Sequence, residues 1–198
     1  MEGRLTFRAT REAHRCGFLS WTAKAPQCET VLDTRTLGLI SEHAIIDPGA
    51  RLAGGVQVWH GTHIRSTATI GFNTTIGANV YIDSDVVIGS SCKIQNGCNI
   101  YHPATIGDNV FIGPGVNIIN DRNPRACNPD GSKRTDDDWV CEGVTIHDNA
   151  SIGTGAILMP GITVGKGAMV GAGAVVCEDV PAGTTVVGIP GRMSTQTP

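Results

Sequence analysis

An aliphatic residue recurs at every sixth position along most of this chain. The series runs from Ile40 to Ile112, resumes at Val140 and continues to Val176. An amphipathic helix would repeat apolar residues about every 3.6 positions and a half-buried strand every two, so neither accounts for a strict period of six. Self-similarity at a fixed period is the signature of a solenoid, in which each repeat buries its apolar side against its neighbours.

The residues between the aliphatics indicate a short strand followed by a tight turn. The fourth position of most hexads is Gly, Asn or Asp, the residue types that tolerate a left-handed backbone. The fifth is small or aliphatic, as at Ala68, Cys92 and Cys98, so two side chains per hexad are expected to face inward. Three such faces would close a triangular coil of about 18 residues, stacked on the next at about 4.8 Å. We therefore predict an all-β parallel β-helix.

Segments outside the repeat divide the chain. Residues 1–37 form an N-terminal extension of unknown role, residues 38–192 the β-helix domain, and residues 193–198 a C-terminal tail. Within the domain, "NDRNPRACNPDGSKRTDDDW" at 120–139, here named the excursion, interrupts the coil. An irregular segment of this length inside a compact domain is usually functional or disordered. We interpret it as functional, because it leaves the coil close to a polar stretch, "IQNGCNIYHPATIG", residues 94–107.

Composition narrows the class of function. Only 17% of the residues are charged and the net charge is −3, so nothing suggests a nucleic-acid partner, which would want a basic patch. No apolar run approaches the ~20 residues of a membrane span, and the first residues lack a signal-peptide pattern. The seven cysteines form no CxxC pair, which is typical of reduced thiols. We therefore expect a cytoplasmic protein with no membrane partner.

Stacking arithmetic places polar residues in columns, because residues 18 apart should lie above one another. The three predicted corner or strand columns are His60, Ala78, Asn96 and Pro114; His63, Tyr81, Asn99 and Asn117; and Ser66, Ser84, His102 and Asn120, with Tyr101 beside the last. Asn96 and His102 hold equivalent positions on successive faces, so they need not meet within one subunit. Where faces of different subunits meet, such polar corners can converge on a substrate.

Four segments carry a more selective signal: "VWHGTHI" (58–64), "KIQNGCNIY" (93–101), "IGPGVNIINDRNPRA" (112–126) and "VVGIPGR" (186–192). Over residues 40–192 the chain resembles the nucleotide-sugar N-acetyltransferases of the hexapeptide-repeat acyltransferase family. The resemblance implies a left-handed β-helix, a homotrimer with sites between subunits, acetyl-CoA as co-substrate and no metal. It also implies acetylation of the 3-amino group of UDP-2-acetamido-3-amino-2,3-dideoxyglucuronate or of dTDP-3-amino-3,6-dideoxyhexoses, by direct attack of the amine on the thioester.

The same resemblance implies roles for individual residues. Asn96 would contact the sugar amine, and His102 is a candidate general base because the unperturbed pKa of histidine lies near 6.5. Substrate contacts would come from His60, His63, Tyr101, Asn120, Asp121 and Arg125. The pantetheine arm would lie along Thr154 and Ala172, one coil apart, and the CoA phosphates would meet Lys166 and Arg192.

Each of these residues also has a simpler interpretation. Asn96 is a residue type suited to a tight corner, and His102 could be a solvated corner histidine. The chain departs from the family pattern at Gly97 and His102, where the family often has Asn and Glu, and at Glu178, where relatives often have Lys. Backbone N–H groups at glycine-rich corners could stabilise the oxyanion in either case.

Three other functions compete with amine acetylation. A γ-class carbonic anhydrase shares the fold but needs a His-x4-His pair among three zinc ligands, whereas His60 and His63 have the wrong spacing and residue 107 is Gly. An O-acetyltransferase would often carry His-Pro at the start of the excursion, where this chain has Asn123-Pro124. A non-catalytic scaffold would need none of the polar corners.

Overall fold

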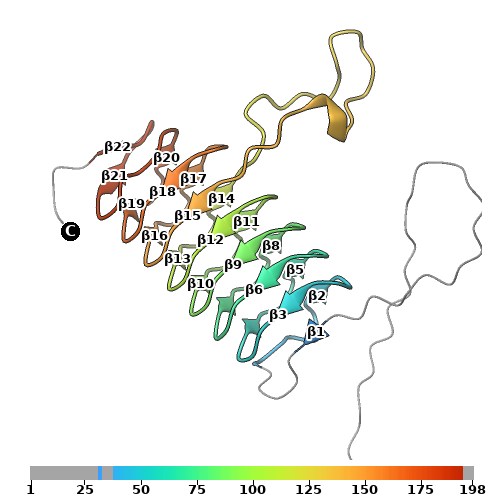
Figure 1. The fold of residues 1–198 in the computed structure, drawn as a ribbon, viewed down its shortest axis with the longest axis vertical. Coiled ribbons are helices and arrows are strands. Elements are labelled where there is room, and N and C mark those ends of the chain that lie inside the picture. The colour runs from blue at the N-terminus through green and yellow to red at the C-terminus, as the bar shows by residue number, and fades with distance from the viewer. Residues whose placement is uncertain (1–30, 33–37, 194–198) are drawn as a thin grey trace, which may run out of the picture.

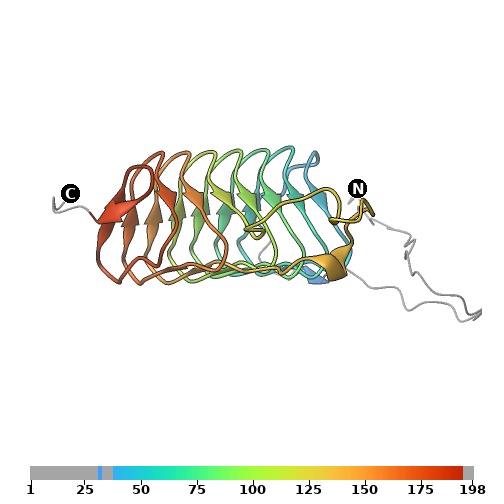
Figure 2. The ribbon, with the colours of Figure 1, turned by 90° about the horizontal axis from the view of Figure 1, so that it is seen from above.

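The computed structural model describes residues 31–32 and 38–193; the rest of the N-terminal extension, and residues 194–198 of the tail, lie outside the described residues. Residues 38–193 wind into a prism of stacked coils made of short strands (Figure 1). Seen from above, the coils form a single row (Figure 2). The all-β parallel β-helix is therefore confirmed, and no α-helix occurs within the described part of the chain.

Three sheets form the faces of the prism. The first contains β1 (Val31–Leu32), β3 (Arg51–Leu52), β6 (Thr69–Ile70), β9 (Val87–Ile88), β12 (Thr105–Ile106), β15 (Thr145–Ile146) and β18 (Thr163–Val164). The second contains β4 (Gln57–Val58), β7 (Thr75–Ile76), β10 (Lys93–Ile94), β13 (Phe111–Ile112), β16 (Ser151–Ile152), β19 (Met169–Val170), β21 (Thr185–Val187) and β22 (Arg192–Met193). The third contains β2 (Ile45–Ile46), β5 (His63–Ile64), β8 (Tyr81–Ile82), β11 (Asn99–Ile100), β14 (Asn117–Ile118), β17 (Ile157–Leu158) and β20 (Val175–Val176).

The register of the sheets follows the predicted stacking. Ile94 of β10 pairs with Ile76 below and Ile112 above, each 18 residues away. The named strands pair in parallel except β21 and β22, which pair antiparallel at the C-terminal end. In the strands from β3 to β20 the first residue faces outward and the second is buried, so the outer face of the sheet can carry polar side chains.

The core is a column of branched aliphatic side chains inside the prism. The inward isoleucines, from Ile64 to Ile118 and at Ile146 and Ile152, are almost completely buried, and burying each contributes roughly 1.5–3 kcal/mol. Fifth-position residues fill the corners, including Cys92 and Cys98, which confirms that these thiols are core residues. Buried Thr62 is satisfied too: its hydroxyl donates to the Gly77 carbonyl at 2.6 Å and accepts from the Val80 N–H at 3.1 Å.

The corners use the left-handed backbone that the fourth hexad position predicted. Asn79 has a φ of 54° and Asp85 a φ of 57°, and Gly97 adopts 70°. A side chain other than glycine, asparagine or aspartate would strain such a corner. The left-handed turn is therefore confirmed at most fourth positions, although Thr67 and Ser91 adopt it as well, with φ of 68° and 56°.

The excursion leaves the coil after β14 and returns at β15, projecting from one side of the prism (Figure 1). It contains η2 (Asp136–Asp138), a short 3₁₀ helix. β12 and β15 stack directly, with Thr105 opposite Thr145, so the coil continues as if uninterrupted. The prediction that the inward series resumes at Val140 is wrong: its side chain is 76% exposed, and the buried column resumes at Ile146. None of the described helices has the length and apolarity needed to cross a bilayer.

Candidate functional site

Three edges join the faces of the prism, and each carries one column of corner residues. The His102 edge contains Ser66, Ser84 and His102; the Asn96 edge contains His60, Ala78, Asn96, Pro114, Thr154 and Ala172; the Asp108 edge contains Ser90, Asp108, Asp148 and Lys166. The excursion begins at the His102 edge, one coil above His102, since Asn120 donates to the His102 carbonyl. The predicted columns are therefore confirmed. The excursion departs from the His102 edge, and the corners of the other two edges are uninterrupted.

A cleft of about 330 Å³ opens at the root of the excursion. It is lined by Asp83, Ser84, His102, Asn120, Trp139 and Cys141. The structure thus brings together two residues that the sequence selected, His102 and Asn120. It adds Asp83, Trp139 and Cys141, which sequence reasoning missed. The volume lies at the lower end of the range for small-molecule sites.

His102 is held at its ring and at its backbone. Its ring Nδ1 lies 3.1 Å from the Ser84 carbonyl oxygen and 3.6 Å from Oδ2 of Asp85, and its backbone N–H points at Oδ2 of Asp83 at 3.4 Å. A carbonyl oxygen can only accept, so Nδ1 carries the proton in this contact. In the neutral ring Nε2 then holds the lone pair and can take up a proton.

The carbonyl group of His102 is the meeting point of the two ends of the excursion. Asn120 Nδ2 donates to it at 2.6 Å, and the Cys141 thiol donates at 3.2 Å. The backbone N–H of Glu142 donates to the Asn120 carbonyl at 3.1 Å and closes the loop. Burial raises the pKa of the Cys141 thiol, and the charges of Asp83 and Asp121 raise it further. Cys141 therefore acts as a hydrogen-bond donor rather than as a thiolate nucleophile.

A polar network continues from the cleft down the third sheet. The Tyr81 hydroxyl donates to Oδ1 of Asp83 at 3.1 Å, and the Tyr81 hydroxyl oxygen accepts from Arg65 NH1 at 3.1 Å. Arg65 Nε donates to Asp47 at 3.0 Å, and His63 Nε2 donates to the same carboxylate at 2.9 Å. The hydrogen bond to Tyr81 raises the pKa of Arg65, and burial raises the pKa of Tyr81. This network reaches His63, which lies one coil below Asp83 at the lower side of the cleft.

Aromatic rings line the same face. His63 meets Tyr81 edge to face at 5.9 Å between ring centroids, and Tyr81 lies 5.6 Å from Tyr101 in a tilted arrangement. These are favourable aromatic geometries. Tyr101 is 36% exposed, so it covers Tyr81 and still presents ring surface to a ligand.

Asn96 lies on a different edge from His102. Its side-chain Oδ1 accepts from the Ala78 N–H at 2.8 Å, and a Cβ on Gly77 would approach that oxygen to 2.5 Å. Oδ1 of Asp108 accepts from the Ser90 N–H in the same way at 2.6 Å. The contact of Asn96 with Ala78 is therefore one that the coil geometry produces at other corners too. The side-chain amide nitrogen of Asn96 makes no hydrogen bond within residues 38–193, and the residue is exposed.

The excursion residues behave differently from one another. Oδ1 of Asp121 accepts from the Asn123 N–H at 2.7 Å and shapes a local turn, while its charge still reaches Cys141. Arg125 is exposed and bonds to the adjacent Pro124 carbonyl at 3.2 Å. Neither Asp121 nor Arg125 is therefore among the residues that line the cleft within one chain.

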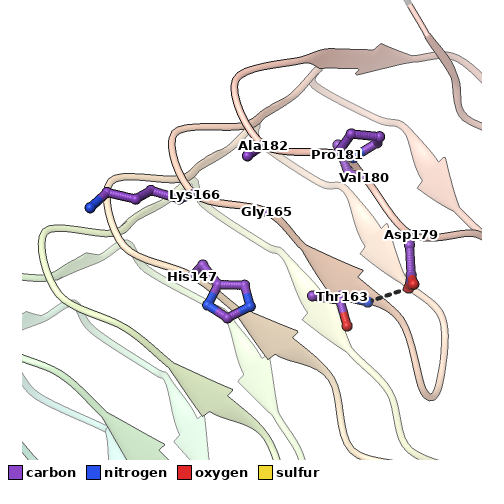
Figure 3. Close-up of a pocket in the computed structure, with 8 residues that line it drawn as sticks. All are labelled: His147, Thr163, Gly165, Lys166, Asp179, Val180, Pro181 and Ala182. Atoms are coloured by element: carbon purple, nitrogen blue, oxygen red, sulfur yellow. Dashed lines mark hydrogen bonds between the residues drawn. The ribbon is translucent and has the colours of Figure 1, made fainter.

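The four residues assigned to the cofactor are divided between edges. Thr154 and Ala172 stack on the Asn96 edge and are exposed. Lys166 borders a shallow hollow on the first sheet together with His147, Thr163, Gly165, Asp179, Val180, Pro181 and Ala182 (Figure 3). Arg192 lies in β22 at the end of the prism. The described residues contain no group of three or more His, Cys, Asp or Glu arranged for a metal.

The repeat of the chain matches a known family model. The family model described as bacterial transferase hexapeptide (six repeats) matches residues 67–101, 85–120 and 143–178. Over those residues the chain matches the repeats of the bacterial hexapeptide transferases. Among curated proteins, none matches the sequence.

Solved structures extend the likeness of this hexapeptide-repeat chain. The acetyltransferase domain of PglB from Neisseria gonorrhoeae is similar with a TM-score of 0.55 and 23% identity, over 80% of this chain and 58% of that one. The chain therefore spans less than two thirds of that structure. The hexapeptide-repeat-containing acetyltransferase VCA0836 from Vibrio cholerae, complexed with acetyl coenzyme A, is similar with a TM-score of 0.52 and 26% identity, over 67% of this chain and 69% of that one.

Proposed function

We propose that the protein is an acetyl-CoA-dependent N-acetyltransferase that acts on the 3-amino group of a nucleotide-linked amino sugar. The likeness to an acetyltransferase complexed with acetyl coenzyme A supports the donor, and the four selective sequence segments support the acceptor. The observation that carries the proposal is His102, whose Nδ1 is committed to the Ser84 carbonyl while its ring borders a cleft.

In this reaction the nucleophile is the amine of the substrate, so the protein has to supply a base and not a nucleophile. The amine nitrogen attacks the thioester carbonyl, the C–N bond forms, the C–S bond breaks, and the amine gives up a proton while the CoA sulfur gains one. Nε2 of His102 accepts the amine proton and can return it to the leaving thiolate. A general base of this kind contributes typically 10²–10⁴-fold, and positioning of the two substrates supplies much of the remainder.

The charge around the cleft favours an amine over an alcohol. The six lining residues include the carboxylate of Asp83 and no lysine or arginine. Asp85 lies 3.6 Å from the ring of His102, and the charge of Asp121 reaches Cys141. Carboxylates attract the ammonium group of an amino sugar, whereas a neutral alcohol gains nothing from their charge.

The separation of the edges bears on the assembly. Asn96 and His102 stand on different edges of one chain, so we propose that they meet across the interface of a homotrimer, in which one copy supplies the His102 edge and its neighbour the Asn96 edge. Thr154 and Ala172, on that second edge, would then guide the pantetheine arm toward the neighbouring cleft. Closed cyclic symmetry is the common arrangement of homo-oligomers.

The test is thiol release from acetyl-CoA with a panel of UDP- and dTDP-linked 3-amino and 4-amino sugars. We expect turnover with a 3-amino sugar, a loss of 10²-fold or more in kcat for His102→Gln, and a rise in KM for Asn96→Ala. Release with hydroxyl acceptors alone would move the assignment to O-acetylation. No release with any acceptor would contradict the proposal and favour a scaffold.

A further inference from the structure

The residues that line the cleft form two walls, which are held in different ways. The coil wall is Asp83, Ser84 and His102, and the excursion wall is Asn120, Trp139 and Cys141. Backbone hydrogen bonds between successive coils hold the coil wall, as where the Asp83 N–H donates to the Ile100 carbonyl at 2.9 Å. The excursion wall comes from the segment between β14 and β15 and lies outside the three sheets. Its position therefore depends on side-chain contacts.

On its lower side the excursion wall is attached at one atom. Asn120 Nδ2 and the Cys141 thiol both donate to the carbonyl oxygen of His102. The backbone N–H of Glu142 donates to the Asn120 carbonyl, which joins the outgoing and returning limbs of the excursion to each other. Two bonds that end on one oxygen leave the limbs free to rotate about it, and a thiol is a weak donor. A second point of attachment is needed to fix the wall.

Arg122 supplies an attachment to the coil above. It lies on the outgoing limb, and its NH2 group donates to the Pro160 carbonyl at 2.5 Å and to Oε2 of Glu142 at 3.1 Å. Glu142 lies on the returning limb, directly after Cys141. Pro160 is a corner residue between β17 and β18, on the His102 edge. One guanidinium group therefore joins both limbs to a fixed point of the prism.

The pair of Arg122 and Glu142 packs against the corner that it binds. Gly161 follows Pro160 with a φ of 77°. A Cβ at Gly161 would lie 2.6 Å from Oε2 of Glu142 and 3.6 Å from NH2 of Arg122. The two side chains are still 47% and 36% exposed, and ion pairs with this exposure contribute little to stability. The charge-assisted bond to a fixed carbonyl group instead gives the limbs a defined position.

We propose that Arg122 is a positioning residue for the cleft: by tying both limbs of the excursion to the Pro160 carbonyl, it holds the excursion wall against the coil wall. The position of the wall does not depend on any reaction. Its consequence for the binding of the acceptor rests on the proposed function.

Trp139 can report the position of the excursion wall without any substrate. Replacing Trp21 and Trp59 with phenylalanine leaves Trp139 as the single indole of the full chain. Quenching of its fluorescence by acrylamide then measures how far the excursion wall is shielded from solvent. All variants below are compared in this background.

Substitutions of Arg122 test the attachment directly. We expect Arg122→Ala to raise the quenching constant of Trp139, and Arg122→Lys, which keeps a donor for the Pro160 carbonyl, to raise it less. Arg125→Ala is the matched control and should leave the constant unchanged, since Arg125 is exposed and bonds to the adjacent Pro124 carbonyl. A folded Arg122→Ala protein with a native quenching constant would overturn the proposal, and so would equal changes in Arg122→Ala and Arg125→Ala.

A second pair of variants tests the same attachment from the coil, whether or not Arg122→Ala folds. The methyl group of Gly161→Ala would displace the carboxylate of Glu142. Gly183→Ala is its control, because Gly183 has a similar φ of 67° and a Cβ there would meet nothing within 4 Å. We expect a rise in Trp139 quenching for Gly161→Ala and a native value for Gly183→Ala. Native quenching in both variants would contradict the attachment.

Activity separates this inference from the function on which it rests. For Arg122→Ala we expect the KM for the acceptor to rise while kcat changes less, as when a binding wall loosens and the base remains. A more exposed Trp139 in a protein that transfers no acetyl group would support the positioning and overturn the function. Acetyl transfer with a native KM in Arg122→Ala, despite a more exposed Trp139, would leave the function standing and overturn the consequence for acceptor binding.

Discussion

Replacing Asn120 with alanine should loosen the root of the excursion more than it destabilises the prism. The side chain donates to the His102 carbonyl at 2.6 Å, and Cys141 donates to the same oxygen at 3.2 Å. Because the weaker thiol donor remains, the cost should be that of one net hydrogen bond, about 1 kcal/mol. For a chain of 198 residues this corresponds to a fall in Tm of about 2–4 °C.

The effect should be local as well as small. Amide exchange should accelerate at Glu142, whose N–H donates to the Asn120 carbonyl, while exchange at Ile100 and Ile106 in the core stays native. kcat should fall because the corner that carries His102 loses a support. Asn128→Ala is the control, since that amide bonds only within the excursion, to Ser132. Native exchange at Glu142 together with native kcat in Asn120→Ala would refute the reasoning.

Three further predictions concern the coil itself. Asn109 adopts a φ of 57°, so Asn109→Ala should lower the free energy of unfolding by about 1 kcal/mol while Asn109→Gly changes it little; equal losses in a denaturant titration would contradict this. Ile100 is fully buried, so Ile100→Ala should cost about 2–5 kcal/mol, and a loss below 1 kcal/mol in the same titration would argue against a packed column. Burial raises the pKa of Cys98, so its contribution to stability is fully present below the ordinary thiol pKa and is lost as pH rises toward the folded pKa. Cys98→Ala should flatten the pH dependence of Tm above about pH 8.5, and an unchanged slope would count against that account.

The fold could be predicted from the sequence because every coil imposes the same six-residue period. Each inward isoleucine must be buried, and each left-handed corner admits few residue types, so the columns at Asn96 and His102 could be derived by counting 18 residues. Val140 shows the limit of counting: it keeps the period but lies outside the coil with an exposed side chain. Periodicity cannot distinguish a residue in a stacked coil from one in a loop of the matching length.

The candidate site could be predicted from the sequence only in part. Counting 18 residues places the residues of a column, but it does not say in which direction each side chain points. Stacking placed Ser84 beneath His102 but could not show that the ring turns down to the Ser84 carbonyl. It gave no sign that Asp47, Arg65 and Tyr81 form one network. Cys141 was missed because its role depends on where the excursion returns.

The most direct test of the account is the pH dependence of acetyl transfer by the native protein and by His102→Gln, with saturating acetyl-CoA and a nucleotide-linked 3-amino sugar. The account predicts that native kcat rises with pH as one group loses its proton, and that His102→Gln loses both the rise and at least 10²-fold in kcat at neutral pH. A His102→Gln protein with native kcat and a native pH profile would contradict it.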